Sequence, residues 1–233
     1  MQLVFHATFE GRSLDRSVWA TCFPWVRRPR AGCTNFGNSD ERAWFMPADD
    51  TVSGGVLHLV ADEHPTKGTT SSGAPETYAY SSGMVTTYKS FSFTYGFVDV
   101  VAHIPGTTGS WPALWLLPRN MAWPPEIDIM ENWGTSDGFR TTFHWSAAGR
   151  SRMTSSYVRT RSDLAGGWHS YGLLWKPGSL TWYLDGRVVV TYTGANVPSH
   201  PMYFLADLGI KGPASSHSSF GIRSVRIYQS RHR

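Results

Sequence analysis

Three carboxylates fall within six residues of this chain: Glu126, Asp128 and Glu131. Only apolar residues separate them, and the β-branched members and the alternation predict a strand. Acidic residues are depleted in strands, so three in one strand call for an explanation. Cleavage of a glycosidic bond needs two carboxyl groups, one ionised and one protonated, and this run could supply them. A solvated strand face is the alternative interpretation.

The spacing of the three acids predicts an irregularity in the strand. In a regular strand the side chains at i, i+2 and i+4 share a face, so Glu126 and Asp128 point one way and Glu131 points the other. One extra residue in a β-bulge returns Glu131 to the first face. We therefore predict a bulge at Ile129–Met130 and one concave surface lined by all three carboxylates. A retaining mechanism needs carboxyl groups about 5–5.5 Å apart, and sequence leaves that spacing a hypothesis.

The elements around the acidic run also have the pattern of short strands joined by turns, with 23 glycines and 14 prolines. Alternating or apolar runs predict strands at residues 3–9, 56–60, 80–87, 95–100, 111–118, 141–145, 201–208 and 220–228, with a strand–turn–strand unit at 168–186. We expect a loop-like insertion at residues 21–39 and a surface loop at 64–76. No repeat, linker or long helix is visible, so one domain over residues 1–233 is expected.

The acidic run resembles the Glu-x-Asp-x-x-Glu signature of family 16 glycoside hydrolases of the laminarinase type. The resemblance continues in family order through blocks at residues 95–100, 109–118, 168–171, 182–186 and 224–229. It implies an all-β fold, namely a two-sheet antiparallel β-sandwich of the jelly-roll, concanavalin-like kind with a concave substrate cleft. The insertion at residues 21–39 would lie near one end of that cleft.

The resemblance also implies roles for individual residues. Glu126 would be the nucleophile and Glu131 the acid and base, and Asp128 between them would keep a proton available to the pair. The expected substrate-binding residues are Trp111, Trp115, Trp123, Trp133, His144, Trp145 and Asp207. Trp123 is expected to stack on the sugar before the scissile bond, with Trp133 or Trp145 as a second platform. His144 is expected beside Glu131. Glu41 could hydrogen-bond at the cleft, with an exposed acid as the alternative. Core packing is the alternative for Trp111, Trp115, Trp133 and His144.

The implied function is a retaining, endo-acting hydrolase of a β-linked polysaccharide, with β-1,3-glucan or mixed-linkage β-glucan as the favoured substrate. A hydrolase of agar- or carrageenan-type galactan or of an acidic bacterial exopolysaccharide is one alternative. Transglycosylation by the same residues is a second. A non-catalytic glucan-binding domain is less expected, because the chain keeps all three acids.

The net charge of +4 favours anionic partners. The chain has no nucleic-acid-binding module, so we expect a polysaccharide substrate and no nucleic acid. An arginine cluster, Arg27, Arg28 and Arg30, predicts a solvated loop, with contact to an acidic polysaccharide as the alternative. No run approaches the length of a membrane span, so no membrane partner is expected. We also expect a monomer.

Two cysteines, Cys22 and Cys33, match no metal motif and are either bridged or buried thiols. A bridge would indicate an oxidising compartment. Many relatives hold a calcium ion with acids in the first and last strands, where this chain has Ala7-Thr8 and Arg223. We therefore expect no metal and no cofactor. A secreted or extracytoplasmic location is expected, although residues 1–8 carry no signal-peptide pattern.

Overall fold

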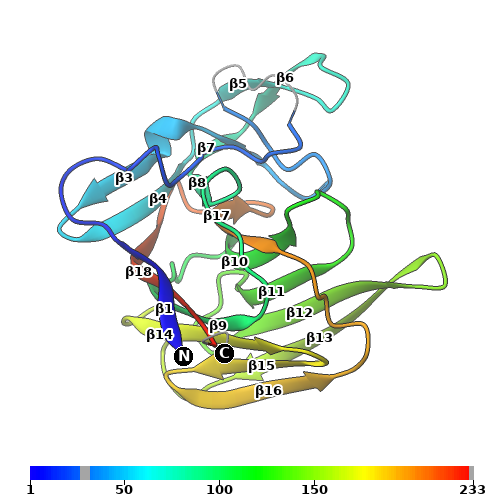
Figure 1. Cartoon of the computed structure of the whole chain (residues 1–233). Coiled ribbons are helices and arrows are strands. Elements are labelled where there is room, and N and C mark those ends of the chain that lie inside the picture. Colours follow the sequence, from blue (N-terminus) through cyan, green and yellow to red (C-terminus); the bar gives the residue numbers. More distant parts are fainter. Residues whose placement is uncertain (27–31, 231–233) are drawn as a thin grey trace.

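The computed structural model of the chain describes residues 1–26 and 32–230 (Figure 1). Its regular structure is almost entirely β, with one short 3-10 turn, η1 (Pro47–Asp49). The arginines at positions 27, 28 and 30 lie outside the described residues. No helix in the described part is long and apolar enough to cross a bilayer.

A six-stranded sheet carries the acidic run. Its strands, in spatial order, are β13 (Arg150–Arg159), β12 (Gly138–Ala147), β11 (Glu126–Glu131), β10 (Ser110–Pro118), β17 (Met202–Ile210) and β8 (Met84–Thr86). All neighbours in this sheet are antiparallel. The acidic strand β11 is therefore an interior strand, with hydrogen-bonded neighbours on both sides.

A larger sheet covers one face of the first. Its main path is β16 (Arg187–Thr193), β15 (Ser179–Leu184), β14 (His169–Lys176), β9 (Gly96–His103), β18 (His217–Gln229), β4 (Val56–Asp62), β7 (Tyr80–Ser82) and β2 (Ala43–Phe45). Two strands lie off this path: β1 (Gln2–Thr8) beside β18, and β3 (Asp50–Ser53) beside β4. Because β1 pairs with β18, the first and last strands lie side by side (Figure 1).

The main core fills the space between the two sheets. Leu114 and Phe204 from the six-stranded sheet and Val100, Trp182 and Ile222 from the larger one belong to the same buried cluster. Burial of large apolar side chains in such a layer is the dominant stabilising term of the fold. The prediction of an all-β, two-sheet sandwich is confirmed.

Strand β10 is buried on both faces, which explains its nearly continuous apolar sequence. Leu114 and Leu116 point into the main core, whereas Trp115 and Leu117 belong to a second cluster on the other face. Phe23 in that second cluster comes from the insertion at residues 21–39. The insertion therefore packs on the outer face of the six-stranded sheet.

A disulfide between Cys22 and Cys33 closes the base of this insertion. The sequence left a bridge and two buried thiols open, and the structure shows the bridge. It joins the segment that carries Phe23 and Trp25, whose rings stack at 4.8 Å, to the edge of β2 through the backbone pairing of Cys33 with Phe45. The disulfide restrains this segment, whose rings Phe23 and Trp25 pack against Trp115.

Besides β2, β3, β13 and β16, where no strand was predicted, the structure departs from the sequence prediction in two places. Residues 64–76, expected as a surface loop, contain most of a hairpin made by β5 (Thr66–Thr69) and β6 (Pro75–Tyr78). Neither strand has a buried residue, and neither has the apolar alternation from which a strand is predicted. The second departure is the pairing of β2 with β7, which is parallel.

Candidate active site

The predicted bulge is present in β11. Asp128 lies opposite Thr142 of β12, and Glu131 lies opposite Arg140. Two residues of β11 therefore lie between these pairs, where β12 has one. On the other side of β11, Met130 and Asp128 face consecutive residues of β10. The extra residue therefore falls at Ile129–Met130. Both of these side chains are buried in the core between the sheets, which leaves Glu131 on the opposite face.

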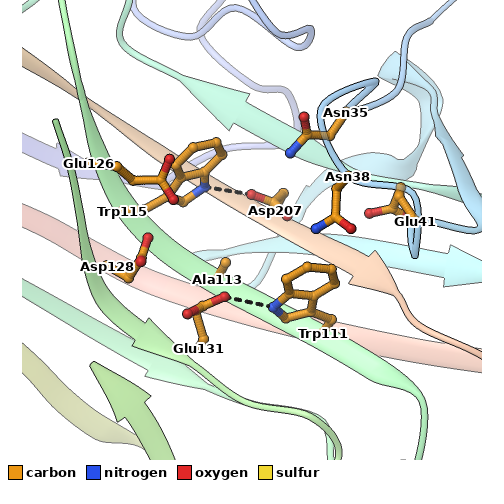
Figure 2. A pocket seen from close by; sticks show the side chains of 10 residues that line it. All are labelled: Asn35, Asn38, Glu41, Trp111, Ala113, Trp115, Glu126, Asp128, Glu131 and Asp207. Atoms are coloured by element: carbon orange, nitrogen blue, oxygen red, sulfur yellow. Dashed lines mark hydrogen bonds between the residues drawn. The ribbon is translucent and has the colours of Figure 1, made fainter. Parts of the chain in front are cut away.

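The bulge brings the three carboxylates onto the outer face of the six-stranded sheet, where all three line one cavity (Figure 2). Glu126 and Glu131 are half-buried at the two ends of the strand, and Asp128 between them is buried. This small cavity has a volume of about 90 Å³ and opens beside a larger one of about 570 Å³ that the same three acids line. The larger volume lies within the range of about 300–1,000 Å³ typical of ligand sites.

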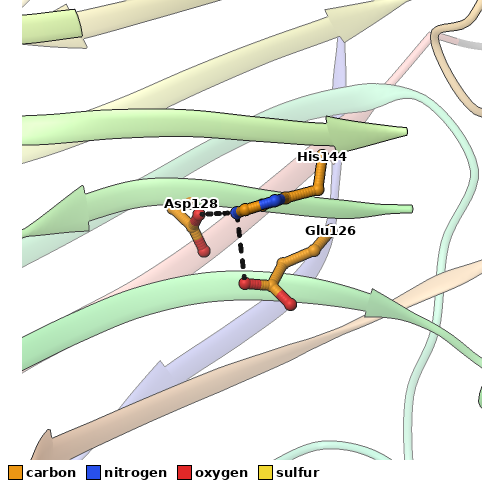
Figure 3. A group of neighbouring side chains, drawn as sticks. All are labelled: Glu126, Asp128 and His144. Atoms are coloured by element: carbon orange, nitrogen blue, oxygen red, sulfur yellow. Dashed lines mark ion pairs between the residues drawn. The ribbon is translucent and has the colours of Figure 1, made fainter. Parts of the chain in front are cut away.

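His144 completes one end of the acid cluster (Figure 3). Its Nε2 lies 3.6 Å from an Asp128 oxygen and 3.9 Å from a Glu126 oxygen. The sequence prediction placed His144 beside Glu131, and this is wrong: in register His144 lies opposite Glu126. Alternation along β12 explains the position, since its cleft-facing residues are spaced by two from Arg140.

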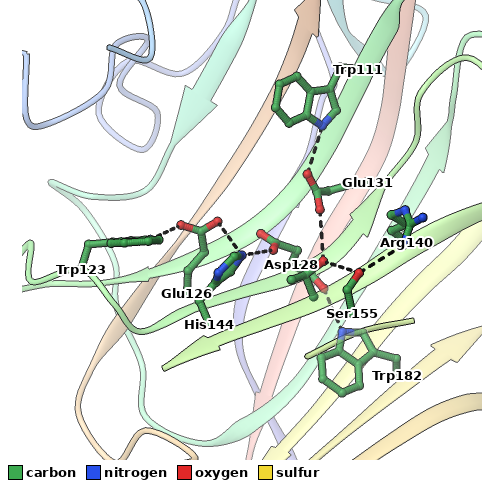
Figure 4. Close-up of polar contacts among 10 residues, drawn as sticks. Trp111, Trp123, Glu126, Asp128, Glu131, Arg140, His144, Ser155 and Trp182 are labelled. Atoms are coloured by element: carbon green, nitrogen blue, oxygen red, sulfur yellow. Dashed lines mark hydrogen bonds and ion pairs between the residues drawn. The ribbon is translucent and has the colours of Figure 1, made fainter. Parts of the chain in front are cut away.

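Tryptophan N–H groups hold the acids in place. Trp123 Nε1 donates to Glu126 at 2.7 Å, and Trp111 Nε1 donates to Glu131 at 3.0 Å (Figure 4). The hydroxyl of Thr142 donates to the other oxygen of Glu131 at 3.3 Å. Hydrogen bonds to a carboxylate restrict its orientation and favour its ionised form.

A further tryptophan holds the backbone of the bulge. Trp182 of β15 is buried in the core and donates its Nε1 to the backbone carbonyl of Asp128 at 2.9 Å (Figure 4). A bulge interrupts the hydrogen-bond ladder, and a buried carbonyl needs a partner. The larger sheet therefore reaches across the core to fix the centre of the acidic strand.

Burial and mutual repulsion raise the pKa of each acid. Burial, and then the adjacent Asp128 carboxylate, raise the pKa of Glu126 well above its usual range. Burial, and then Glu131, do the same to the pKa of Asp128. Burial also raises the pKa of Glu131, but the bonds from Trp111 and Thr142 oppose the rise. Because each ionised group disfavours ionisation of its neighbours, the cluster holds a proton more tightly than isolated carboxyls would.

The structure brings most of the predicted binding residues to the cleft. The larger cavity is lined by Trp111, Trp115, Trp123 and His144. Trp123 is 58% exposed, with its ring 5.8 Å from that of His144. Asp207 lines the smaller cavity and accepts a 2.7 Å hydrogen bond from Trp115 Nε1 (Figure 2). Its pKa is raised well above the usual range, chiefly by burial.

Two of the predicted tryptophans lie elsewhere. The prediction that Trp145 could be a cleft platform is wrong, because it shares the inner face of β12 with Phe143 and stacks on that ring at 5.1 Å. A one-residue offset from His144 is enough to place it on the other face. Trp133 is not core, being 40% exposed, and it lies outside the two cavities, against Arg140 and Lys211.

The cleft also contains residues that the sequence did not single out. Asn35 and Asn38 of the insertion line both cavities, and Trp25 lines the larger one. The only signal for them was the position of the insertion near the cleft. Glu41, which the sequence did single out, lines the smaller cavity and accepts hydrogen bonds from the backbone N–H groups of Ala43 and Ile210. Burial raises the pKa of Glu41 to about 7.

One group of side chains in the described part could hold a metal ion. Ligand atoms of Glu126, Asp128 and His144 all lie within 4.8 Å of one another. These are the residues of the acid cluster itself, so a bound cation would compete with the proton that the cluster retains. The expectation that the protein uses no metal stays a prediction.

The fold and the cleft together define a class: a jelly-roll β-sandwich with a carboxylate cluster on a bulged strand and tryptophans around it. The chain belongs to family 16 of the glycosyl hydrolases, whose family model matches residues 42–213.

Two curated relatives come from Rhizobium meliloti (strain 1021). Endo-1,3-1,4-beta-glycanase ExsH is 31% identical over 227 residues, and Endo-1,3-1,4-beta-glycanase EglC is 34% identical over 209. These alignments cover 90% and 84% of this chain but only 45% and 43% of the relatives, so the chain spans less than half of their length. Among solved structures, LamAcat from Zobellia galactanivorans superposes with a TM-score of 0.82 at 27% identity, covering 98% of each chain.

Proposed function

We propose that this chain is a retaining, endo-acting hydrolase of β-linked glucan, with β-1,3-linked or mixed-linkage β-glucan as its substrate. The observation that carries the proposal is the placement of Glu126, Asp128 and Glu131 on one face of a bulged strand, in a cleft of family 16 architecture. Both Rhizobium relatives are named endo-1,3-1,4-beta-glycanases, which supports a 1,3-1,4-β-linked substrate. A structure of the Zobellia protein in complex with laminaritriose and laminaritetraose supports a glucan.

In the proposed mechanism Glu126 attacks the anomeric carbon and forms a glycosyl-enzyme intermediate, while Glu131 donates its proton to the departing oxygen. Glu131 then removes a proton from the incoming water, which releases the sugar with its configuration retained. The mechanism needs one ionised and one protonated carboxyl. The cluster can keep that one proton because the pKa of every member is raised. Asp128 disfavours simultaneous ionisation of the pair.

The walls of the cleft suit an extended sugar chain. Trp123 presents an exposed ring beside Glu126, and sugar rings pack on aromatic faces through their apolar sides. Trp111 bonds to Glu131 on the other side of the cluster. The chain of the substrate would thus run across the acidic strand, from Trp123 on the Glu126 side toward Trp111 on the Glu131 side.

A substrate panel tests the proposal. Reducing ends released from laminarin, curdlan, lichenan, agarose and κ-carrageenan would be measured, together with product size over time and the anomer first formed. We expect β-anomeric oligosaccharides of intermediate size from the β-glucans. Activity on the galactans alone would favour the galactan alternative, and products longer than the substrate would indicate transglycosylation. Binding without any cleavage would indicate a glucan-binding domain.

Replacement of the acids tests the assignment of roles. Glu126→Gln and Glu131→Gln are each expected to lower kcat by about 10³-fold or more while leaving the fold intact. Azide should restore glycosyl transfer in Glu126→Ala and give an α-glycosyl azide if that residue is the nucleophile, because the shortened side chain leaves room for the small anion. Glu10→Gln, at an exposed carboxylate, is the matched control and should retain full activity. Full activity in either cleft variant would refute the assignment.

We further propose that the chain acts as a single-domain monomer outside the cytoplasm. The disulfide between Cys22 and Cys33 supports an oxidising compartment. Light scattering of the purified protein would test the oligomeric state, and limited proteolysis would test whether residues 1–233 resist cleavage as one unit.

A further inference from the structure

A row of cations and aromatic rings extends from the cleft on the side of Glu131. Trp111 begins the row, and the Lys211 ammonium lies 5.5 Å from its ring centroid and 5.3 Å from that of Trp133. The Arg140 guanidinium lies 5.0 Å from the Trp133 centroid and 5.8 Å from that of Tyr157. We call these five residues the cation–aromatic row. Each cation is within the distance of about 6 Å at which cation–π attraction acts.

The register of the sheet places the row on the face that carries the acids. Arg140 is the cross-strand partner of Glu131, and cross-strand partners point to the same side of a sheet. Tyr157 of β13 is in turn the partner of Arg140. Trp111 both donates to Glu131 and lines the two cavities. The row therefore continues the cleft beyond Glu131; Figure 4 shows two of its members, Trp111 and Arg140, on either side of Glu131.

The Arg140 guanidinium has no carboxylate within ion-pair distance in the described residues, although its charge opposes the rise in the pKa of Glu131. The Nε of Arg140 is buried without a hydrogen-bond partner in residues 1–26 and 32–230. Its guanidinium donates a long hydrogen bond of 3.5 Å to the Ser155 hydroxyl. A half-buried guanidinium with an unsatisfied N–H is unfavourable unless something pairs with it. A planar carboxylate is the complementary group, because it can accept two parallel N–H bonds from one guanidinium.

Lys211 adds a second, more exposed cation to the same row. It pairs with Asp40 at 2.9 Å, and both side chains are substantially exposed to solvent. Such exposed pairs are weak and exchange partners readily. Both cations lie over the ring of Trp133, and 40% of the surface of this residue is exposed, so a bound sugar can contact its exposed part.

We propose that the cation–aromatic row binds an acidic sugar unit, or a carboxylate-bearing substituent, of the polysaccharide on the leaving-group side of the scissile bond. The Arg140 guanidinium pairs with the carboxylate, Lys211 adds long-range attraction, and Trp133 packs on the sugar ring. The inference rests on the proposed function for its direction: Glu131 protonates the departing oxygen, so sugars beyond Glu131 belong to the leaving chain. The substrate is then a β-glycan with anionic groups, and not a neutral glucan alone.

Two polymers that differ only in charge test this inference: laminarin, and carboxymethyl-laminarin prepared from the same batch. Affinities for both would be measured by calorimetry on the Glu126→Gln background, and kcat/KM would be measured on the enzyme with Glu126 intact. Arg140→Gln and Lys211→Gln each remove one cation of the row. Arg187→Gln, at an exposed arginine of β16 on the other sheet, removes the same charge elsewhere and is the matched control.

We expect the parent protein to bind carboxymethyl-laminarin more tightly than laminarin, with the preference shrinking as salt rises. Arg140→Gln should weaken binding of the charged polymer about ten-fold, and Lys211→Gln about three-fold. Neither variant should change the affinity for laminarin. Arg187→Gln should leave the affinities for both polymers unchanged. Because Arg140 lies near Glu131, the comparison of the two polymers in one variant separates recognition of charge from an effect on the acid.

Equal losses on both polymers, or no loss on either, would overturn the inference and leave the proposed function standing if laminarin is still cleaved. Absence of cleavage of both polymers by the intact protein would instead overturn the proposed function. The affinity data decide the inference even then. A preference for the charged polymer that depends on Arg140 supports anion binding by the cation–aromatic row, and the lack of such a preference refutes it.

Discussion

The hydrogen bond from Trp182 to the backbone of Asp128 predicts that a core residue of the opposite sheet controls catalysis. Trp182→Phe keeps an aromatic ring in the core but removes the N–H that meets the Asp128 carbonyl at 2.9 Å. That carbonyl lies beside the bulge, where the strand has fewer ladder bonds to hold it. We expect the backbone between Asp128 and Glu131 to relax and the acids to move relative to one another.

The size of the effect follows from the burial of the bond. Leaving a buried carbonyl without its donor costs about 1–3 kcal/mol, and the smaller ring adds a cavity term of about 1 kcal/mol. The free energy of unfolding should therefore fall by about 2–4 kcal/mol. A displacement of the acids by about 1 Å would lower kcat by about 10²-fold, with a smaller change in KM.

Trp175→Phe is the matched control. Trp175 is buried in the same core and donates its Nε1 to a backbone carbonyl, that of Pro198, at 3.0 Å. Urea unfolding should show a similar loss of stability in both variants, whereas kinetics on laminarin should show a loss of kcat only in Trp182→Phe. Equal kcat values in the two variants would refute the idea that Trp182 positions the acidic strand.

Three other perturbations have defined outcomes. Burial raises the pKa of Glu41 from 4.5 to about 7, so the folded state binds this proton more tightly and the free energy of unfolding falls as pH rises through this range. Between pH 5 and 8 the fall should be up to about 3 kcal/mol in urea titrations of the parent protein, and it should be absent in Glu41→Gln. Replacing Cys22 and Cys33 by serine opens a loop of separation 11 and should lower the free energy of unfolding by about 3 kcal/mol, with reductant then having no further effect. Trp123→Phe removes a bond that lowers the pKa of Glu126, so the acidic limb of the pH–rate profile should move to higher pH, whereas Trp123→Ala should also raise KM about ten-fold; an unshifted limb in the phenylalanine variant would contradict the first expectation.

The sequence predicted the acidic strand well because two local rules determine it. Strand alternation and the five-residue spacing of Glu126 and Glu131 require a bulge if both are to share a face, and the structure has it at Ile129–Met130. The two-sheet architecture was equally predictable from sequence, since β10 and β17 are long apolar runs. These features depend on the period of a pattern and not on distant parts of the chain.

The partners of the acids could not be predicted in the same way, because they depend on register and on contacts across the core. A one-residue difference separates His144 in the cleft from Trp145 in the core, and no rule of composition distinguishes them. Trp182 is a packing residue of the core, but its bond to Asp128 comes from a strand more than 50 positions away. The β5–β6 hairpin was missed because its strands carry no buried apolar face.

The extra residue in β11 also determines how this site tolerates changes of length. In most strands the loss of one residue turns everything beyond it to the wrong side. Here, deletion of Ile129 or Met130 would leave Glu-Ile-Asp-X-Glu, a plain alternation in which all three acids still face outward. The acidic strand therefore has two workable lengths, one with and one without the inserted residue, and the shorter form would draw Glu131 closer to Asp128.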